Sequence, residues 1–221
     1  MYRKELAYYF SGPIAYTVIG LYLLTISLFL WVIPGQWNII DSGYAQLDGL
    51  FELGPWLLML LCPALTMRLF AEERQTGTWD VLLSKRIPLR RIVWSKFLAA
   101  WTLTVLALLP CIVHYFIVSA IAEPVGNVDG GQFAGSFAGL VCLSGVFTAL
   151  GVAAGSFSKN QIVSFIAAVT LCFVLYWVTL KDHYVGISRG VIDLGDLLYF
   201  AAITVAAVWA GILILNRLSH K

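Results

Sequence analysis

Six apolar stretches dominate this sequence, and each is long enough to cross a lipid bilayer as a helix. They occupy about residues 14–33, 53–70, 97–122, 133–157, 162–180 and 197–215. A hydrocarbon core of about 30 Å needs about 20 residues, because the helical rise is about 1.5 Å per residue. The chain is 60% hydrophobic and 12% charged, whereas soluble domains are about 45–50% apolar and about 25% charged. The sequence therefore predicts an all-α membrane protein with six transmembrane helices in a single domain over residues 1–221.

The positive charges are unevenly distributed along the chain. Half of the fourteen Lys and Arg residues fall between Pro63 and Phe97. With a cytoplasmic N-terminus, twelve of the fourteen lie on the cytoplasmic side, and only Lys181 and Arg189 lie outside. Because Lys and Arg are enriched in cytoplasmic loops, we expect both termini and residues 71–96 to lie in the cytoplasm.

The residues before the first span have the pattern of an amphipathic interface helix. Within residues 1–13, Tyr2 and Tyr9 follow helical spacing, while Arg3 and Lys4 lie on the opposite side. Such a helix lies along the membrane surface with its aromatic rings at headgroup depth. The alternative interpretation is a frayed polar tail.

The second span contains an internal proline and ends in charged residues. Pro63 has no N–H to donate to the carbonyl four residues back, so it predicts a kink. This kink is either a static bend or a hinge. Glu72, Glu73 and Arg74 then end the span in the cytoplasm, and Gly77 interrupts the helix.

A short cytoplasmic helix is predicted directly after this break. Thr78 is a suitable N-cap, and Asp80 in the first turn complements the helix dipole. Trp79, Leu82 and Leu83 share one face at i, i+3, i+4 spacing. A helix this short needs something to pack against, so we expect its apolar face to lie on the membrane or to dock into a groove of a soluble partner.

Catalytic motifs are not recognisable in the sequence. The glycines between residues 151 and 159 do not have phosphate-loop spacing, so we expect no nucleotide site in this chain. Ser144 and His114 superficially resemble a serine–histidine pair, but Cys142 stands where a glycine would be needed, and a serine within a span more often contacts a neighbouring helix. We expect no catalytic, cofactor-binding or metal-binding residue and no enzyme activity. His114 is either a functional intramembrane residue or an interhelical hydrogen-bond partner. The four cysteines each lie in an apolar stretch without CxxC spacing, which indicates small buried side chains.

The fourth span is rich in small residues. The pairs Gly135/Gly139 and Gly151/Gly155 have the spacing that allows helix backbones to approach closely. Packing within the chain is the favoured interpretation, and a subunit contact is the alternative. Since the membrane centre contains no Asp, Glu, Lys or Arg, an ion-coupled transporter is disfavoured.

The stretch EERQTGTWDVLLSKRIPLRRIVWSKF, residues 72–97, resembles the cytoplasmic motif of type-2 ABC exporter permeases. The segments KELAYYFSGPIAY and PALTMRLFAEER resemble in particular the gliding-motility-associated branch of this family. The resemblance implies that residues 1–13 are the family's interface helix and that residues 181–196 contain its re-entrant hairpin. It implies an ATPase-coupling surface made of Glu72, Glu73, Arg74, Gly77, Thr78, Trp79, Asp80, Leu82 and Leu83. The turn that matches the second cytoplasmic loop is Ser158, Lys159, Asn160 and Gln161.

The resemblance also implies a function. The chain would be the transmembrane permease subunit of an ABC exporter in the bacterial inner (cytoplasmic) membrane. ATP and Mg²⁺ would bind in a partner ATPase, present in two copies. A second permease copy or a related permease would complete the path, with a periplasmic or auxiliary membrane subunit as a further possible partner. We expect contact with the lipid bilayer and none with nucleic acid.

Two alternatives come from other classes. A membrane scaffold or assembly factor that anchors cytoplasmic proteins explains the basic cytoplasmic surface equally well. An intramembrane hydrolase would depend on Ser144 and His114.

Overall fold

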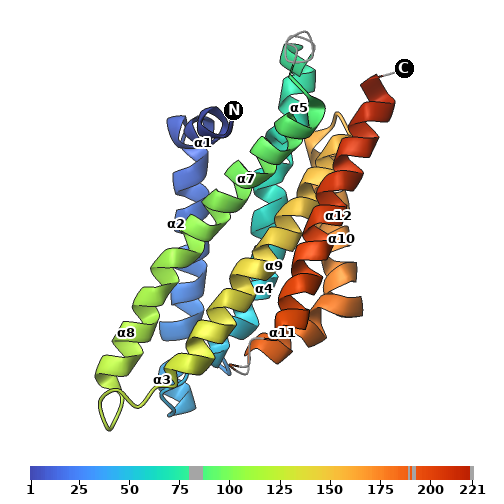
Figure 1. Cartoon of the computed structure of the whole chain (residues 1–221). Helices are drawn as coiled ribbons and strands as arrows, with labels where there is room; N and C mark the ends of the chain where they lie inside the picture. Colours follow the sequence, from blue (N-terminus) through green and yellow to red (C-terminus); the bar gives the residue numbers. More distant parts are fainter. Residues whose placement is uncertain (80–86, 189, 191–192, 220–221) are drawn as a thin grey trace.

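The computed structural model describes residues 1–79, 87–188, 190 and 193–219 and consists of helices, without a strand among those residues (Figure 1). The helices of the first half are α1 (Tyr2–Ser11), α2 (Ile14–Trp31), α3 (Ile39–Ser42), α4 (Asp48–Thr66), α5 (Arg68–Gln75), α7 (Leu89–Leu108), η1 (Leu109–Cys111) and α8 (Ile112–Ile121). The second half contributes α9 (Gly130–Phe157), α10 (Gln161–Leu175), the π-helical segment η2 (Tyr176–Leu180), α11 (Lys181–Ser188) and α12 (Leu194–Ser219).

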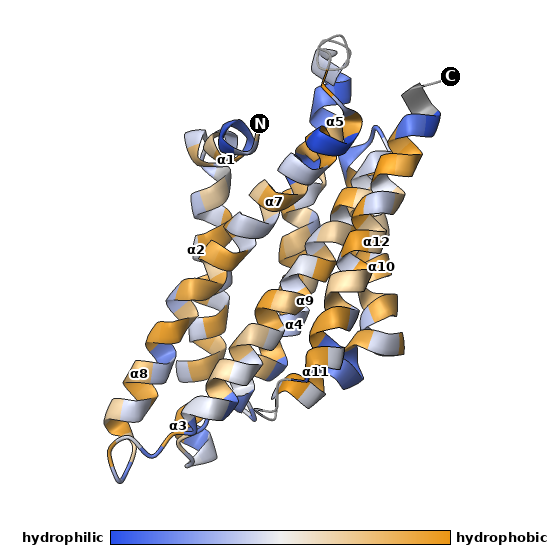
Figure 2. Cartoon of the chain, viewed as in Figure 1, coloured by the Kyte–Doolittle hydropathy of each residue, from blue (hydrophilic) through white to orange (hydrophobic). Residues whose placement is uncertain are grey.

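Five helical units in the described part of the chain are long and apolar enough to cross a membrane. They are Asp48–Gln75, Leu89–Ile121, Gly130–Phe157, Gln161–Ser188 and Leu194–Arg217. A sixth results if α1 and α2, which meet at 71°, are counted as one broken span. Figure 2 shows apolar residues along the lengths of these helices and polar residues near their ends. The prediction of an all-helical multi-pass membrane protein is confirmed.

Helix α9 is the centre of the bundle. It packs against α4, α7, α10, α11 and α12, and 72% of its most apolar window is buried, against 22% for α10–α11. Its glycines make this possible: a Cβ at Gly151 would collide with the Thr66 side chain of α4, and one at Gly135 would lie 2.8 Å from the Ile187 oxygen of α11. These contacts confirm that the small residues of the fourth span serve packing within the chain.

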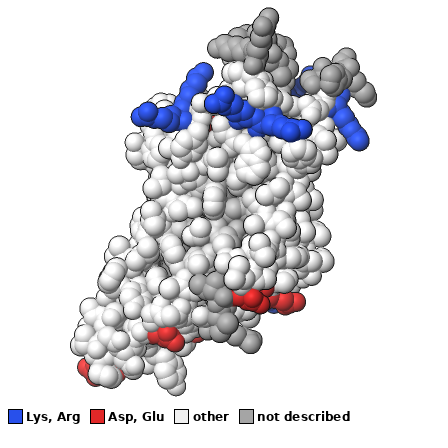
Figure 3. All heavy atoms as spheres, viewed as in Figure 1, with Lys and Arg blue, Asp and Glu red and all other residues white. Residues whose placement is uncertain are grey.

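The two ends of the bundle differ in charge. The N-terminus, α5 and the end of α12 lie at one end in Figure 1, and Lys and Arg gather there on the face drawn in Figure 3, with Asp and Glu at the opposite end. We call these the basic end and the acidic end. Helix α1 lies across the basic end, while α2 runs along the bundle (Figure 1).

The helices extend beyond several of the expected span limits. Helix α7 begins at Leu89, before the span expected from residue 97, and α4 continues through Pro63 to Thr66 with only Met67 separating it from α5. The fifth helical unit continues to Ser188 instead of ending near Leu180. Residues 181–188 are therefore helical, and the re-entrant hairpin expected over 181–196 is wrong for this part.

The reason for the longer fifth helix is that its end is anchored on neighbouring helices. The Tyr184 hydroxyl donates a 2.9 Å hydrogen bond to the Phe51 oxygen of α4, and Ile187 is fully buried. Lys181 folds its ammonium group over the Trp177 ring, 4.3 Å from the centroid. The charged residues after position 180 thus lie on the exposed side of a helix whose other side remains packed.

Candidate functional site

The candidate site lies at the basic end, where α5 stops. Gly77 has a φ of +71°, a left-handed conformation that glycine adopts without steric cost. The hydroxyl of Thr76 donates to the main-chain oxygen of Glu72 at 2.9 Å, and that of Thr78 donates to the main-chain oxygen of Glu73 at 3.3 Å. The two threonine hydroxyls are themselves 2.9 Å apart. The Glu72 carbonyl also accepts from the Thr76 N–H at 2.9 Å, so the threonine hydroxyls add to the main-chain bond that ends α5.

Trp79 is turned into the protein. It is 9% exposed, its ring packs edge-on against Phe70 with 5.8 Å between centroids, and the Arg74 guanidinium lies 5.6 Å from its centroid. The expectation that Trp79 shares an outward docking face is therefore wrong: this side chain anchors the segment to α5. The other predicted members of that face, Asp80, Leu82 and Leu83, lie outside the described residues.

The end of α5 contacts the turn between α9 and α10. The Arg74 guanidinium donates to the Ser156 oxygen at 3.0 Å, and the Gln75 amide donates to the Lys159 oxygen at 3.2 Å. The two cytoplasmic elements expected from the sequence, 72–79 and 158–161, are therefore brought together.

The α9–α10 turn is held by its own side chains. The Ser158 hydroxyl accepts from the Asn160 N–H at 3.0 Å, and the Asn160 side chain accepts from the Ile162 N–H at 2.9 Å. Asn160 is thus the N-cap of α10, and Gln161 is its first residue. The turn is a defined structure, since both of its side-chain caps are satisfied.

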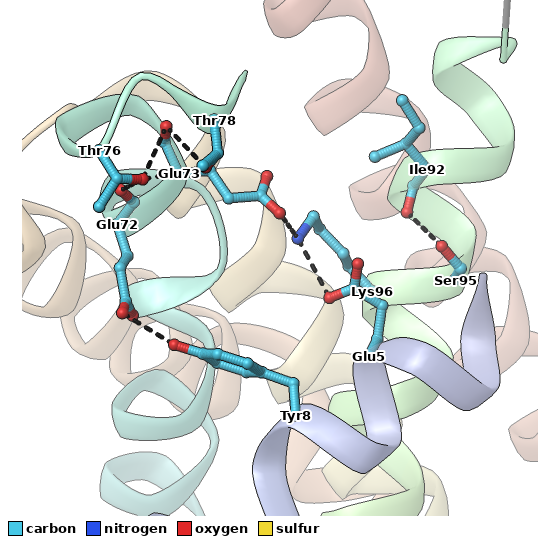
Figure 4. A network of polar contacts seen from close by, with 9 residues as sticks. All are labelled: Glu5, Tyr8, Glu72, Glu73, Thr76, Thr78, Ile92, Ser95 and Lys96. Carbon is cyan, nitrogen blue, oxygen red and sulfur yellow. Dashed lines mark hydrogen bonds and ion pairs between the residues drawn. The ribbon is translucent and has the colours of Figure 1, made fainter. Parts of the chain in front are cut away.

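Sequence reasoning missed the most buried charge of this region. Lys96 is 1% exposed and donates to Glu73 Oε1 at 2.6 Å and to Glu5 Oε2 at 3.2 Å, so it joins α7 to both α5 and α1 (Figure 4). Its ammonium group also lies 5.7 Å from the centroid of the Phe70 ring. A lysine buried this deeply must be paired. Its burial could have been predicted from the sequence, because Lys96 follows apolar Ile92 and Val93 by one helical turn and therefore shares their face.

A second polar contact lies beside this ion cluster. The Tyr8 hydroxyl of α1 donates to Glu72 Oε1 at 2.8 Å (Figure 4). Between α1, α4, α5 and α7 there is a cleft of about 470 Å³ whose lining includes Tyr8, Glu72, Glu73 and Lys96. Three of the predicted coupling residues, Glu72, Glu73 and Thr78, therefore face a concave surface shared with α1.

The serine–histidine pair is not assembled. Ser144 on α9 donates to the Val141 oxygen at 2.7 Å and accepts from the Trp101 indole. His114 on α8 accepts a 3.1 Å hydrogen bond from the Trp31 indole of α2. Each side chain has a different partner, which favours helix-packing roles over shared hydrolytic chemistry.

The fold and this site define a class: a multi-pass helical membrane protein with an organised polar surface at its basic end. A comparison with protein families identifies the class more closely, because the model of ABC-2 family transporter proteins matches residues 38–181, more than half of the chain. The chain belongs to this family and is a transmembrane ABC permease, the membrane component that works with an ABC ATPase. No curated protein matches the sequence significantly.

Proposed function

We propose that the chain is the permease subunit of an ABC exporter, close to the gliding-motility-associated branch. It works in the bacterial inner membrane with both termini in the cytoplasm. Two ATPase subunits bind ATP and Mg²⁺, and a second permease, identical or related, completes the translocation path. A periplasmic or auxiliary membrane subunit is a further partner in this proposal.

The observation that carries the proposal is the junction between α5 and the α9–α10 turn. Arg74 and Gln75 bond to the main-chain oxygens of Ser156 and Lys159. A partner that pushes on either element therefore acts on α4–α5 and on α9, the two most buried helical units. This is the arrangement that a motor subunit requires, because force applied at the surface reaches the centre of the bundle.

In this mechanism, closure of the ATPase dimer displaces the segment after Gly77. Trp79 transmits the displacement to Phe70, against which it packs. Helix α4–α5 then tilts, with Pro63 as the proposed hinge, since the residue lacks the N–H that would stiffen that turn. Lys96 carries the same displacement to α1, the proposed interface helix, through Glu5.

The test is isolation of the native complex. Purification in mild detergent followed by mass spectrometry should recover an ATPase with a phosphate-binding loop in stoichiometric amounts. Leu82→Asp with Leu83→Asp should abolish this recovery without reducing membrane insertion, since two carboxylates would replace the apolar face expected to dock.

A matched control places the same change at the acidic end. Val125 is 78% exposed, and Val125→Asp should leave ATPase recovery unchanged. Unchanged recovery with the Leu82/Leu83 variant would contradict the coupling assignment. Absence of any ATPase, even with ATP hydrolysis trapped, would favour the membrane scaffold.

A further inference from the structure

The cleft between α1, α4, α5 and α7 combines an apolar wall with a charged rim. Ala64, Leu65 and Leu69 contribute the wall, and Leu65 and Leu69 are 2% and 8% exposed. Lys4 and Arg68 line the same cleft and are both exposed. A concave site of this size, about 470 Å³, lies within the range of ligand-binding clefts, about 300–1,000 Å³. Its composition suits an amphiphile.

The side chains that line the cleft include three cations and three carboxylates, but not all of them form ion pairs. Lys4, Arg68 and Lys96 oppose Glu5, Glu72 and Glu73. Lys96 is shared by Glu5 and Glu73. Lys4 and Arg68 form no ion pair with another residue of the described part of the chain.

One acceptor in the cleft is also left without a partner. Glu73 Oε2 is buried and has no hydrogen-bond partner among the described residues, although Oε1 of the same carboxylate is bonded to Lys96. A buried carboxylate oxygen is costly to leave unsatisfied. The cleft therefore offers two unpaired cations and one unpaired acceptor, a pattern that matches a ligand with a phosphate and a hydrogen-bond-donating cation.

We propose that this cleft binds the headgroup of a phospholipid with a primary ammonium group, such as phosphatidylethanolamine. Lys4 and Arg68 hold the phosphate, and the ammonium group pairs with the Glu73 carboxylate, whose side chain is 24% exposed. The acyl chains leave the cleft along Ala64, the half-buried residue of its apolar wall, which belongs to a helical unit apolar enough to span the membrane. This continuity favours a bilayer lipid over a soluble protein segment as the occupant. The proposal does not depend on transport or on its direction.

The experiment uses the full chain in nanodiscs with equal parts of phosphatidylethanolamine, phosphatidylcholine and phosphatidylglycerol with identical acyl chains. Native mass spectrometry of the released protein should show phosphatidylethanolamine enriched about threefold to tenfold over phosphatidylcholine, the factor expected from one hydrogen bond that only the primary ammonium group can donate. Phosphatidylcholine is the informative competitor, because its ammonium group has no N–H to donate.

Variants assign the binding to the cleft. Lys4→Gln with Arg68→Gln should remove the enrichment, and both residues are exposed, so folding should not change. Arg91→Gln with Arg217→Gln is the matched control and should retain the enrichment. Both arginines are exposed and lie outside the cleft lining, at the start of α7 and the end of α12, which are at the same end of the bundle (Figure 1).

Four results would overturn the proposal. They are equal retention of the three lipids, enrichment of phosphatidylglycerol in place of phosphatidylethanolamine, and equal loss in the control variant. The fourth is displacement of the lipid by soluble phosphoethanolamine or by the partner ATPase, which would assign the cleft to a free headgroup or to a protein interface.

Discussion

The ammonium group of Lys96 lies 2.6 Å from Glu73 Oε1, in a position where the lysine side chain is 2% exposed. Because Glu5 shares the same cation, Lys96→Met would leave two largely buried carboxylates unpaired. Breaking a fully buried pair costs about 3–5 kcal/mol, and partial exposure of the carboxylates reduces this to about 1–3 kcal/mol. Thermal unfolding in detergent should show the loss.

A charge-neutral variant separates pairing from packing. Adding Glu5→Gln and Glu73→Gln to Lys96→Met should recover most of the lost stability, since no unpaired charge remains. Arg91→Met, at an exposed position of the same helix, serves as the control. An unchanged unfolding temperature for Lys96→Met alone would show that the ion cluster does not stabilise the basic end.

Arg74 should matter for coupling more than for assembly. Arg74→Met removes the hydrogen bond to the Ser156 oxygen, and we expect stimulation of the partner ATPase to fall about tenfold, equivalent to ~1.4 kcal/mol of coupling free energy. Recovery of the ATPase with the permease should be unaffected. Arg90→Met is the control, because Arg90 stacks on Trp209, 4.7 Å from its centroid, away from this junction. Full stimulation with Arg74→Met would exclude the junction as a transmission route.

Gly151 lies where α9 has no room for a larger residue beside α4. Gly151→Ala would bring its Cβ into the Thr66 side chain, and overpacking of this kind costs about 1–3 kcal/mol. Combination with Thr66→Ala should restore the unfolding temperature. Gly20→Ala is the control, since nothing lies within 4 Å of the added carbon and alanine is the better helix former. Equal effects at both glycines would refute this explanation.

His114 should tolerate replacement by another hydrogen-bond acceptor. His114→Leu would leave the Trp31 indole N–H without its acceptor, at a cost of about 1–3 kcal/mol, whereas His114→Gln keeps an acceptor and should be close to the wild type. Unfolding temperature and ATPase stimulation of both variants provide the measurement. Loss of function in the stable Gln variant would instead assign His114 a direct part in transport.

The orientation of the bundle can be tested by cysteine labelling. In intact cells, a membrane-impermeant maleimide should label Val125→Cys at the acidic end and should not label Lys159→Cys at the basic end. Background should be low, because Cys62, Cys111 and Cys172 are buried and Cys142 is half-buried within the apolar helix α9. The opposite labelling pattern would reverse the proposed cytoplasmic position of both termini.

The lengths of the apolar stretches predicted the membrane-spanning helices, because the length of such a stretch can be read from neighbouring residues alone. Sequence periodicity could not predict the ion pairs of Lys96, whose counter-charges lie 91 and 23 residues away in sequence. It also misplaced Trp79, because helical spacing defines a shared face without defining what that face contacts. The end of the fifth helix could not be predicted either, because the contacts that hold it come from other helices. Lys181 and the charged residues after it are compatible with a loop or with the exposed side of a packed helix.

The π-helical segment η2 has a geometric consequence for the fifth span. Buried residues from α10 to α11 recur at every fourth position: Ser164, Ala168, Cys172, Tyr176, Leu180 and Tyr184. Four residues of an ideal α-helix turn through about 400°, so five such steps would rotate the stripe by about 200°. The wider turn of Tyr176–Leu180 rotates less per residue and counteracts this drift. Cys172 and Tyr184 can therefore both meet α9, at Phe147 and at Gly139. Deleting one residue of η2 would put the two halves of the span out of phase, turning Tyr184 away from α9 by about 100°.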